Sequence, residues 1–226
     1  MISSHPEIEL AGFIEQTCLR PTTAAEDVRQ VCWEAQHYRF AAVCVPPTFA
    51  RLAVDLLHQQ RPQVYTVIGF PLGQSTSTTK LYEAEEAAAT GVDGLEVMVN
   101  LGAIKQGDYN TAYEELGRIV DAVPCAVRAI VELSLLNADE RRHLAEVCMD
   151  VGVTAIKTAT GWSGPVNCQD VQGLRRVVRG QLAIKAAGGV RTYSQSLELL
   201  AAGASRLGTS RGVEILREQQ QWSKSA

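Results

Sequence analysis

Two lysines occupy equivalent places in two similar segments of the chain. Lys157 lies in AIKTATG and Lys185 in AIKAAGGVR, each after apolar residues and before small residues and glycine. A short apolar run of this kind is typical of a parallel strand buried on both faces. Because burying an ammonium group is costly, each lysine either extends to water, pairs with a carboxylate such as Glu132, or has a chemical task. Because such a lysine occurs in two successive segments, a chemical task is favoured over exposure to water or simple pairing with a carboxylate.

Two adjacent lysines can support imine formation. A free lysine has a pKa of about 10.4 and is protonated at neutral pH. A second ammonium nearby and partial desolvation lower the pKa of a lysine and release the nucleophilic amine. The imine then withdraws electrons, so that a neighbouring carbon–carbon bond can break or form. Glu15, Glu96 and Glu132 also lie in or next to predicted strands, where each either moves protons or only neutralises the lysine pair.

Glycine-rich segments follow the last two predicted strands. In a barrel, the loops after strands seven and eight and a helix N-terminus are the usual phosphate site. The alternative is that these glycines only serve tight turns. The candidate groups are the backbone of Gly188, Gly189 and Gly208, the hydroxyls of Thr209 and Ser210, and the guanidinium groups of Arg191 and Arg211.

Short apolar runs alternate with helical segments along the chain. Helices are predicted at Thr79–Thr90, Asn137–Asp150, Asn167–Val178 and Thr192–Ala202, the last three opening on capping residues. This alternation predicts a parallel sheet covered by helices, and eight units favour a closed (β/α)₈ barrel over a flavodoxin-like open sheet. The predicted strands are Ile14–Leu19, Ala41–Val45, Val64–Phe70, Leu95–Val99, Val127–Val131, Thr154–Lys157, Leu182–Lys185 and Ser205–Gly208.

The chain reads as one α/β domain over residues 1–226. It contains no Pro/Gly/Ser linker and no fixed-period repeat, and the polar tail from about residue 218 is expected to be loose. Met1–Leu10 lacks the basic start and apolar core of a signal peptide. No apolar run approaches the roughly 20 residues that a membrane span needs.

Composition excludes several classes of function. The net charge of -4 argues against a nucleic-acid surface, which needs clustered lysine and arginine. The six cysteines are scattered without CxxC spacing, as expected of reduced thiols in a cytoplasmic protein. Neither they nor the four histidines form a ligand cluster, so we expect no metal and no other cofactor, which disfavours a metal-dependent aldolase.

Longer motifs resemble one family over nearly the whole chain. IKTATGW, IKAAGGVRT and GASRLGTSRGVEIL, with TVIGFPLG and FAAVCVPPTFA upstream, resemble the deoxyribose-phosphate aldolases. The resemblance implies a cofactor-free class I aldolase on a (β/α)₈ barrel. Such an enzyme reversibly cleaves 2-deoxy-D-ribose 5-phosphate into acetaldehyde and D-glyceraldehyde 3-phosphate, so its partner is a small phosphorylated sugar or aldehyde.

The resemblance also assigns roles to residues of this chain. It implies that Lys157 forms the Schiff base, that Lys185 perturbs it and relays protons, and that Glu96 is the acid/base group. The implied substrate- and phosphate-binding residues are Thr158, Thr160, Gly161, Gly188, Gly189, Gly208, Thr209 and Ser210. The implied walls of the site are Glu15, Thr17, Cys44 and Glu132.

Departures from the family pattern cluster near the chemistry. Glu15 and Glu96 replace aspartates, Arg20 replaces a lysine, and Ala159 replaces a serine. Glutamate is longer by one methylene, about 1.5 Å, and a misplacement of about 1 Å can cost on the order of 100-fold in rate. We therefore keep three hypotheses: an active deoxyribose-phosphate aldolase, a Schiff-base aldolase of altered preference, and a barrel that binds a sugar phosphate without turnover.

The sequence leaves the oligomeric state open. Barrels of this type often form dimers or larger homo-oligomers. Trp33 and Trp222 are candidates for contacts between protomers.

Overall fold

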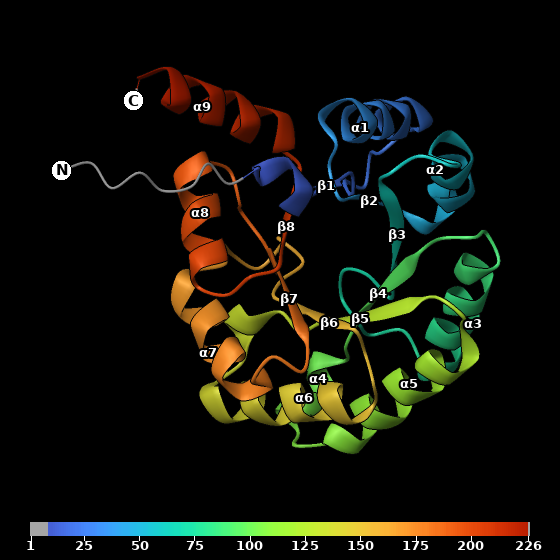
Figure 1. The fold of residues 1–226 in the computed structure, drawn as a ribbon. Coiled ribbons are helices and arrows are strands. Elements are labelled where there is room, and N and C mark those ends of the chain that lie inside the picture. The colour runs from blue at the N-terminus through green and yellow to red at the C-terminus, as the bar shows by residue number, and fades with distance from the viewer. Residues whose placement is uncertain (1–8, 226) are drawn as a thin grey trace.

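Eight parallel strands close into a barrel in chain order, with β8 pairing back to β1 (Figure 1). The structure, a computed structural model, describes residues 9–225. Closure confirms the (β/α)₈ barrel and excludes the open sheet. The strands are β1 Ile14–Thr17, β2 Ala42–Val45, β3 Gln63–Ile68, β4 Gly94–Met98, β5 Ala126–Ile130, β6 Ala155–Lys157, β7 Ala183–Ala187 and β8 Arg206–Thr209.

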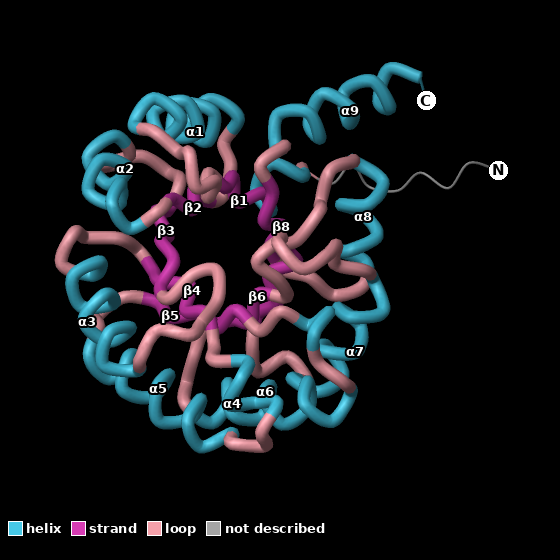
Figure 2. Tube along the Cα trace, turned by 180° about the vertical axis from the view of Figure 1, so that it is seen from behind, coloured by secondary structure: helices cyan, strands magenta, loops and turns pink. Residues whose placement is uncertain are grey.

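Helices form a ring outside the barrel (Figure 2). Short 3₁₀ turns precede β1 at Leu10–Phe13, follow β2 at Pro47–Phe49 and follow β5 at Leu133–Leu135. The α-helices are α1 Ala25–Tyr38, α2 Ala50–Leu56, α3 Ser77–Ala88, α4 Leu101–Lys105, α5 Tyr109–Ala122, α6 Ala138–Asp150, α7 Cys168–Val178, α8 Tyr193–Ala201 and α9 Gly212–Ser225.

The predicted capping residues begin the helices that follow β5, β6 and β7. Asn137 accepts the backbone N–H of Glu140, whose carboxylate accepts the N–H of Asn137 in return. Asn167 and Thr192 cap α7 and α8 through the same three-residue spacing. These caps satisfy backbone donors that a helix start leaves unpaired, so local sequence fixes where each crossover helix begins.

Alternation along the strands separates the helix-facing core from the barrel interior. In β6, Ile156 packs in the core between barrel and helices, whereas the neighbouring Lys157 points inward. The interior holds a small apolar group of its own, which includes Cys44, Tyr65 and Met98. A side chain at position 94 would lie 2.3 Å from the Tyr65 ring, so this ring needs Gly94 beside it. The interior is therefore a packed core that also carries charged side chains, among them Lys157 at the C-terminal end of β6.

The C-terminal residues differ from the predicted loose tail, because α9 continues through Ser225. The Glu218 carboxylate accepts the backbone N–H of Tyr193 at 2.7 Å, and the Trp222 ring lies 6.4 Å from the Tyr193 ring. These contacts hold α9 against α8. The signal-peptide question falls mainly on residues 1–8, which lie outside the described residues. Within the described part, none of the helices is long and apolar enough to cross a membrane.

Candidate active site

Lys157 and Lys185 are direct neighbours on the same side of the barrel wall. They are register partners in the β6–β7 ladder, and both are about 1% exposed. Strand alternation turns both side chains inward, because residues in register on adjacent parallel strands share a face. The repeated AIK motif thus places two amines together inside the barrel.

The Glu96 carboxylate lies between the two amines. Its Oε2 accepts from Lys157 Nζ at 2.7 Å, and its Oε1 accepts from Lys185 Nζ at 2.6 Å. Glu96 comes from β4 and has no exposed surface. The longer side chain at this family aspartate position therefore reaches both lysines at once.

A second carboxylate and an arginine complete the charged cluster. Glu15 on β1 accepts from Lys185 Nζ at 2.5 Å and from Arg128 NH1 at 2.8 and 2.9 Å. Arg128 also lies 3.5 Å from Glu96, and its guanidinium stacks 3.6 Å from the Tyr65 ring centroid. These charges come from different strands and meet only because the sheet closes.

The carboxylates change the electrostatics that we expected of a lysine pair. Burial alone would lower the pKa of Lys185, but Glu15 and Glu96 hold this pKa above its ordinary value. Burial alone would raise the pKa of Glu96, yet Lys157, Lys185 and Arg128 keep it far below the usual range. Lys185 is consequently a firmly protonated partner, and Glu96 is a carboxylate.

Cys44 closes one side of this cluster. Burial, reinforced by the charge on Glu96, raises the pKa of the Cys44 thiol to about 12. The protonated thiol donates to Glu96 Oε2 at 3.4 Å. A thiol in this state is a poor nucleophile, which agrees with a wall position.

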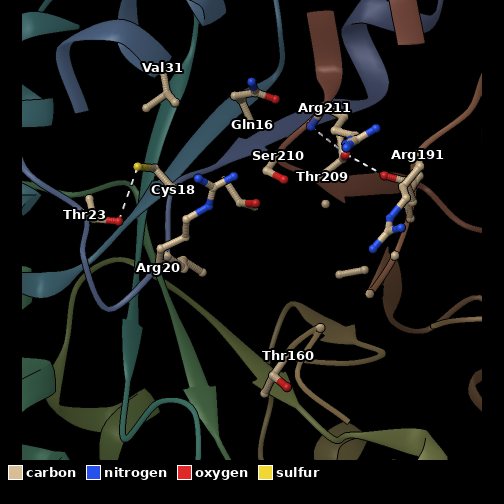
Figure 3. A pocket seen from close by; sticks show the side chains of 18 of the residues that line it. Gln16, Cys18, Arg20, Thr23, Val31, Thr160, Arg191, Thr209, Ser210 and Arg211 are labelled. Carbon is tan, nitrogen blue, oxygen red and sulfur yellow. Dashed lines mark hydrogen bonds between the residues drawn. The ribbon is translucent and has the colours of Figure 1, made fainter. Parts of the chain in front are cut away.

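A cavity of about 600 Å³ opens at the C-terminal ends of the strands, and Figure 3 shows side chains that line it. Lys157 lines this cavity, whereas Lys185 is not among the described residues that line it. The other predicted site residues that line it are Thr17, Thr160, Gly161, Gly188, Gly189, Gly208, Thr209 and Ser210. The candidate nucleophile and the candidate phosphate loops therefore share one space.

Glycine is required in the loop after β7. Gly188 has a φ of 104°, and a Cβ there would lie 3.1 Å from the Gly164 carbonyl oxygen and 3.2 Å from Ala159 Cβ. Gly189, at a φ of 66°, would crowd Pro165 in the same way. Backbone N–H groups in this conformation can approach an anion closely, which supports a phosphate cradle.

The second loop joins β8 to α9. Thr209 lines the cavity but uses its hydroxyl to donate to the Val190 carbonyl and to accept from the Arg211 N–H. Ser210 is exposed beside it, just before the start of α9. Arginine side chains also line the mouth, Arg20 from the β1 side and Arg191 and Arg211 from the loops after β7 and β8 (Figure 3).

Two predicted site residues, Thr158 and Glu132, lie elsewhere than expected. The Thr158 hydroxyl donates to the Ala187 carbonyl and accepts its N–H, so Thr158 joins β6 to β7 instead of facing the cavity. Glu132 pairs with neither lysine; its Oε2 accepts from the backbone and hydroxyl of Thr160. Glu132 therefore holds the loop that follows Lys157. Its Oε1 is buried without a partner among the described residues.

Sequence reasoning missed Arg128 and its support by Tyr65. The signal was present, because Arg128 stands in the middle of the apolar run AVRAI, where a charge needs a partner. Within residues 9–225 no group of three or more His, Cys, Asp or Glu side chains is arranged to hold a metal ion.

The proteins most similar to this chain in the comparisons below are aldolases, in agreement with the lysine pair inside the barrel. No family model matches the chain. A deoxyribose-phosphate aldolase from Gloeobacter violaceus is 73% identical over 226 residues, which is all of both chains. The solved structure of an aldolase called QR15 shares 30% identity with a TM-score of 0.89, covering 96% of this chain and 97% of the other.

A second solved structure, described as a unique tetrameric deoxyribose phosphate aldolase from Aeropyrum pernix, is 27% identical with a TM-score of 0.86. The match covers 96% of this chain and 92% of that one. A sequence identity of 73% over the full length of both chains is far more than a shared barrel fold alone would give. The chain therefore belongs to the deoxyribose-phosphate aldolase family.

Proposed function

We propose that this protein reversibly cleaves 2-deoxy-D-ribose 5-phosphate into acetaldehyde and D-glyceraldehyde 3-phosphate through a Schiff base on Lys157. One observation carries the residue assignment. Lys157 alone of the register pair lines the cavity, and its Nζ is 2.7 Å from a carboxylate that a second lysine also binds. The family membership supports the substrate.

The first steps form and use the imine. The neutral Lys157 amine attacks the aldehyde carbon C1 of the open-chain sugar, and the carbinolamine loses water to give the imine. Removal of the proton from the C3 hydroxyl then breaks the C2–C3 bond. The electron pair moves into an enamine, and glyceraldehyde 3-phosphate leaves. Protonation at C2 and hydrolysis by water release acetaldehyde and restore the amine.

Proton transfer in this scheme falls to the groups that contact Lys157. Glu96 is ionised and hydrogen-bonded to Lys157, so its carboxylate can accept protons as the imine forms. Lys185 is protonated and shares the same carboxylate, so it can return a proton through Glu96. The cluster therefore provides both an acceptor and a donor at the position of the nucleophile.

The phosphate end of the substrate is assigned to the loops after β7 and β8. Gly188 and Gly189 present backbone N–H groups, and Ser210 precedes the positive end of α9. Arg191 and Arg211 add charge at the same wall. The assignment leaves the sugar chain to run from these loops down to Lys157.

The glutamates at the two family aspartate positions do not favour the hypothesis of a barrel that binds a sugar phosphate without turnover. Both glutamates contact their lysines at 2.5 to 2.7 Å, so the added methylene does not separate the charges. An altered substrate preference stays open as a second candidate, because Arg20 and Gln16 line the mouth.

We also infer that the protein acts in the cytoplasm and as a homo-oligomer. Its six cysteines are free, as expected in a reducing compartment. Oligomerisation is supported by the tetrameric relative from Aeropyrum pernix and by the exposure of Trp33 and Trp222, at 53% and 66%. Light scattering of the purified protein measures the state directly.

The test of the function is reductive trapping. Borohydride added with 2-deoxyribose 5-phosphate should leave a reduced adduct on Lys157, located by peptide mass spectrometry. Lys157→Ala should give none, and Lys185→Met, which removes a neighbouring cation, should slow both the trapping on Lys157 and turnover. No adduct from folded parent protein, combined with thermal stabilisation by the sugar phosphate, would establish binding without turnover. Adducts with a panel of other aldehydes, and poor turnover of the deoxyribose ester, would favour the altered aldolase.

A further inference from the structure

Each of the eight strands places one titratable side chain in a continuous network inside the barrel. In strand order these are Glu15, Cys44, Tyr65, Glu96, Arg128, Lys157, Lys185 and Arg206. Their charges are therefore coupled, and the charge on one strand bears on the protonation of the others.

The buried part of this network carries more positive than negative charge when every group has its ordinary form. Lys157, Lys185 and Arg128 are cations, while Glu15 and Glu96 are anions, and all five side chains are at most 8% exposed. Three cations and two anions leave a net charge of +1.

The remaining members of the network do not offset this excess. Cys44 is a neutral thiol, because burial raises its pKa to about 12, and burial likewise raises the pKa of Tyr65. Arg206 adds a further positive charge 3.7 Å from Glu15, but its side chain is 41% exposed, so water screens it. The buried net charge therefore remains positive.

An uncompensated charge inside a protein is costly, and losing one proton removes it. Arg128 cannot be the group that loses it, since a guanidinium is not deprotonated in proteins. Lys185 donates to both carboxylates, whereas Lys157 donates to Glu96 alone among residues 9–225 and faces the cavity. The least costly proton to release is therefore on Lys157.

We propose that Arg128 is a positioning residue that supplies this excess charge, so that Lys157 can give up its proton and act as the nucleophile. The inference rests on the proposed function, because it assumes that Lys157 is the amine that attacks. Arg128 acts through the carboxylates. It donates to Glu15 and forms an ion pair with Glu96, and so it neutralises part of the negative charge that would otherwise hold both lysines protonated. The Tyr65 ring, whose centroid lies 3.6 Å from the guanidinium carbon of Arg128, holds the guanidinium in place.

Lys157 Nζ gives one proton to solvent through the cavity, and its lone pair then forms the bond to the carbonyl carbon. Without Arg128 the buried set holds two cations and two anions and is neutral with both lysines charged. The amine would then become available only at higher pH.

The experiment follows imine formation with acetaldehyde as the probe, trapped by cyanoborohydride across a pH series and measured as the initial rate of adduct on Lys157. For Arg128→Gln we expect the midpoint of this profile to move to higher pH by about one unit or more. Arg128→Lys, which keeps the charge, should stay near the parent. Arg206→Gln, which removes the screened cation from the same carboxylate, should move the midpoint less.

A double variant separates charge from structure. Glu15→Gln combined with Arg128→Gln restores a buried excess of one positive charge and should bring the midpoint back toward the parent. Glu15→Gln alone should move it to lower pH, and this variant tests the proposal even if Arg128→Gln does not fold. A midpoint that is the same in Arg128→Gln and the parent, or no return in the double variant, would overturn the role of Arg128. A parent protein without any adduct on Lys157 would instead overturn the proposed function.

Discussion

Glu96 holds Lys157 through one carboxylate oxygen and Lys185 through the other, although the two lysines are themselves partners in the β6–β7 register. The two lysines therefore share one carboxylate, which offsets the repulsion between their ammonium groups. This relationship makes the protonation of each amine depend on the geometry of a side chain from β4. It also explains why a glutamate can stand where related aldolases are expected to carry aspartate.

Replacing Glu96 should impair both activity and stability. Glu96→Gln removes the only carboxylate that Lys157 contacts within the described structure, and we expect a loss in kcat of about 100- to 10,000-fold. Breaking a buried ion pair from one side also destabilises a protein by about 3–5 kcal/mol. Steady-state assays and urea unfolding measure the two effects.

Glu96→Asp is the matched control for length. The shorter side chain keeps the charge but cannot hold both lysines at 2.6 and 2.7 Å without a backbone shift. We expect a smaller loss in kcat, of about 10- to 100-fold. Equal losses in the two variants would mean that reach, not charge, is what the reaction needs from this position.

Much of this fold was predictable from the sequence, because its signals are local. Each predicted strand overlaps an observed one, and Asn137 and Thr192 cap the helices that they were expected to begin. Buried parallel strands have few polar residues, so apolar runs mark them clearly. Lys80 shows the limit of such reasoning. It lies in a polar helical segment yet is fully buried, paired with Glu115 at 2.7 Å.

The candidate site was less predictable, because its partners come from distant strands. The lysine pair followed from a repeated motif, but the choice of carboxylate depended on barrel closure, which brings Glu15 on β1 beside Lys185 on β7. Glu132 stands just past the end of β5 and was as good a candidate by position. Its backbone φ of 42° accompanies a carboxylate that binds Thr160 instead. Sequence spacing carries no signal for that difference.

Gly188→Ala should weaken binding of phosphorylated substrates. The substitution forces a residue with a Cβ into a φ of 104° and against the Gly164 carbonyl oxygen, a strain of about 1–3 kcal/mol. If the loop shifts to relieve it, KM for 2-deoxyribose 5-phosphate should rise by about 10-fold or more. Unphosphorylated 2-deoxyribose should be turned over with an unchanged KM.

Gly107→Ala is the control for backbone strain alone. Gly107 also has a positive φ, of 77°, but a Cβ there meets no atom within 4 Å, and it lies outside the cavity lining. This variant should lose some stability and keep the KM of the parent. A rise in KM for both sugars in Gly188→Ala would place the loop's role in the sugar site and not at the phosphate.

The buried carboxylates should make the protein sensitive to acid. The charges of Lys185 and Arg128 outweigh burial and keep the pKa of Glu15 below its ordinary 4.5, as the cluster does for Glu96. The unfolded chain therefore takes up these protons first as the pH falls. The stabilisation is complete above about pH 4.5 and is lost progressively below it, by about 1.4 kcal/mol per pH unit for each group.

Urea unfolding at a series of pH values from neutral to acidic measures this loss. Glu96→Gln removes one of the two groups, so its free energy of unfolding should fall less steeply with acid than that of the parent. Equal slopes in the two proteins would mean that Glu96 carries an ordinary pKa in the folded state.

The C-terminal turns of α9 should stabilise α8, the helix that follows the loop after β7. Glu218 accepts the N–H of Tyr193 at the start of α8, directly after the capping Thr192. Glu218→Ala leaves this donor without its partner and should lower the free energy of unfolding by about 1–2 kcal/mol. Because α8 follows the loop of Gly188 and Gly189, a small rise in KM for the phosphorylated sugar should accompany it. Gln220→Ala, an exposed change on the same helix outside the cavity lining, is the control for helix composition, and a stability loss as large as that of Glu218→Ala would show that the α8 contact is not what α9 contributes.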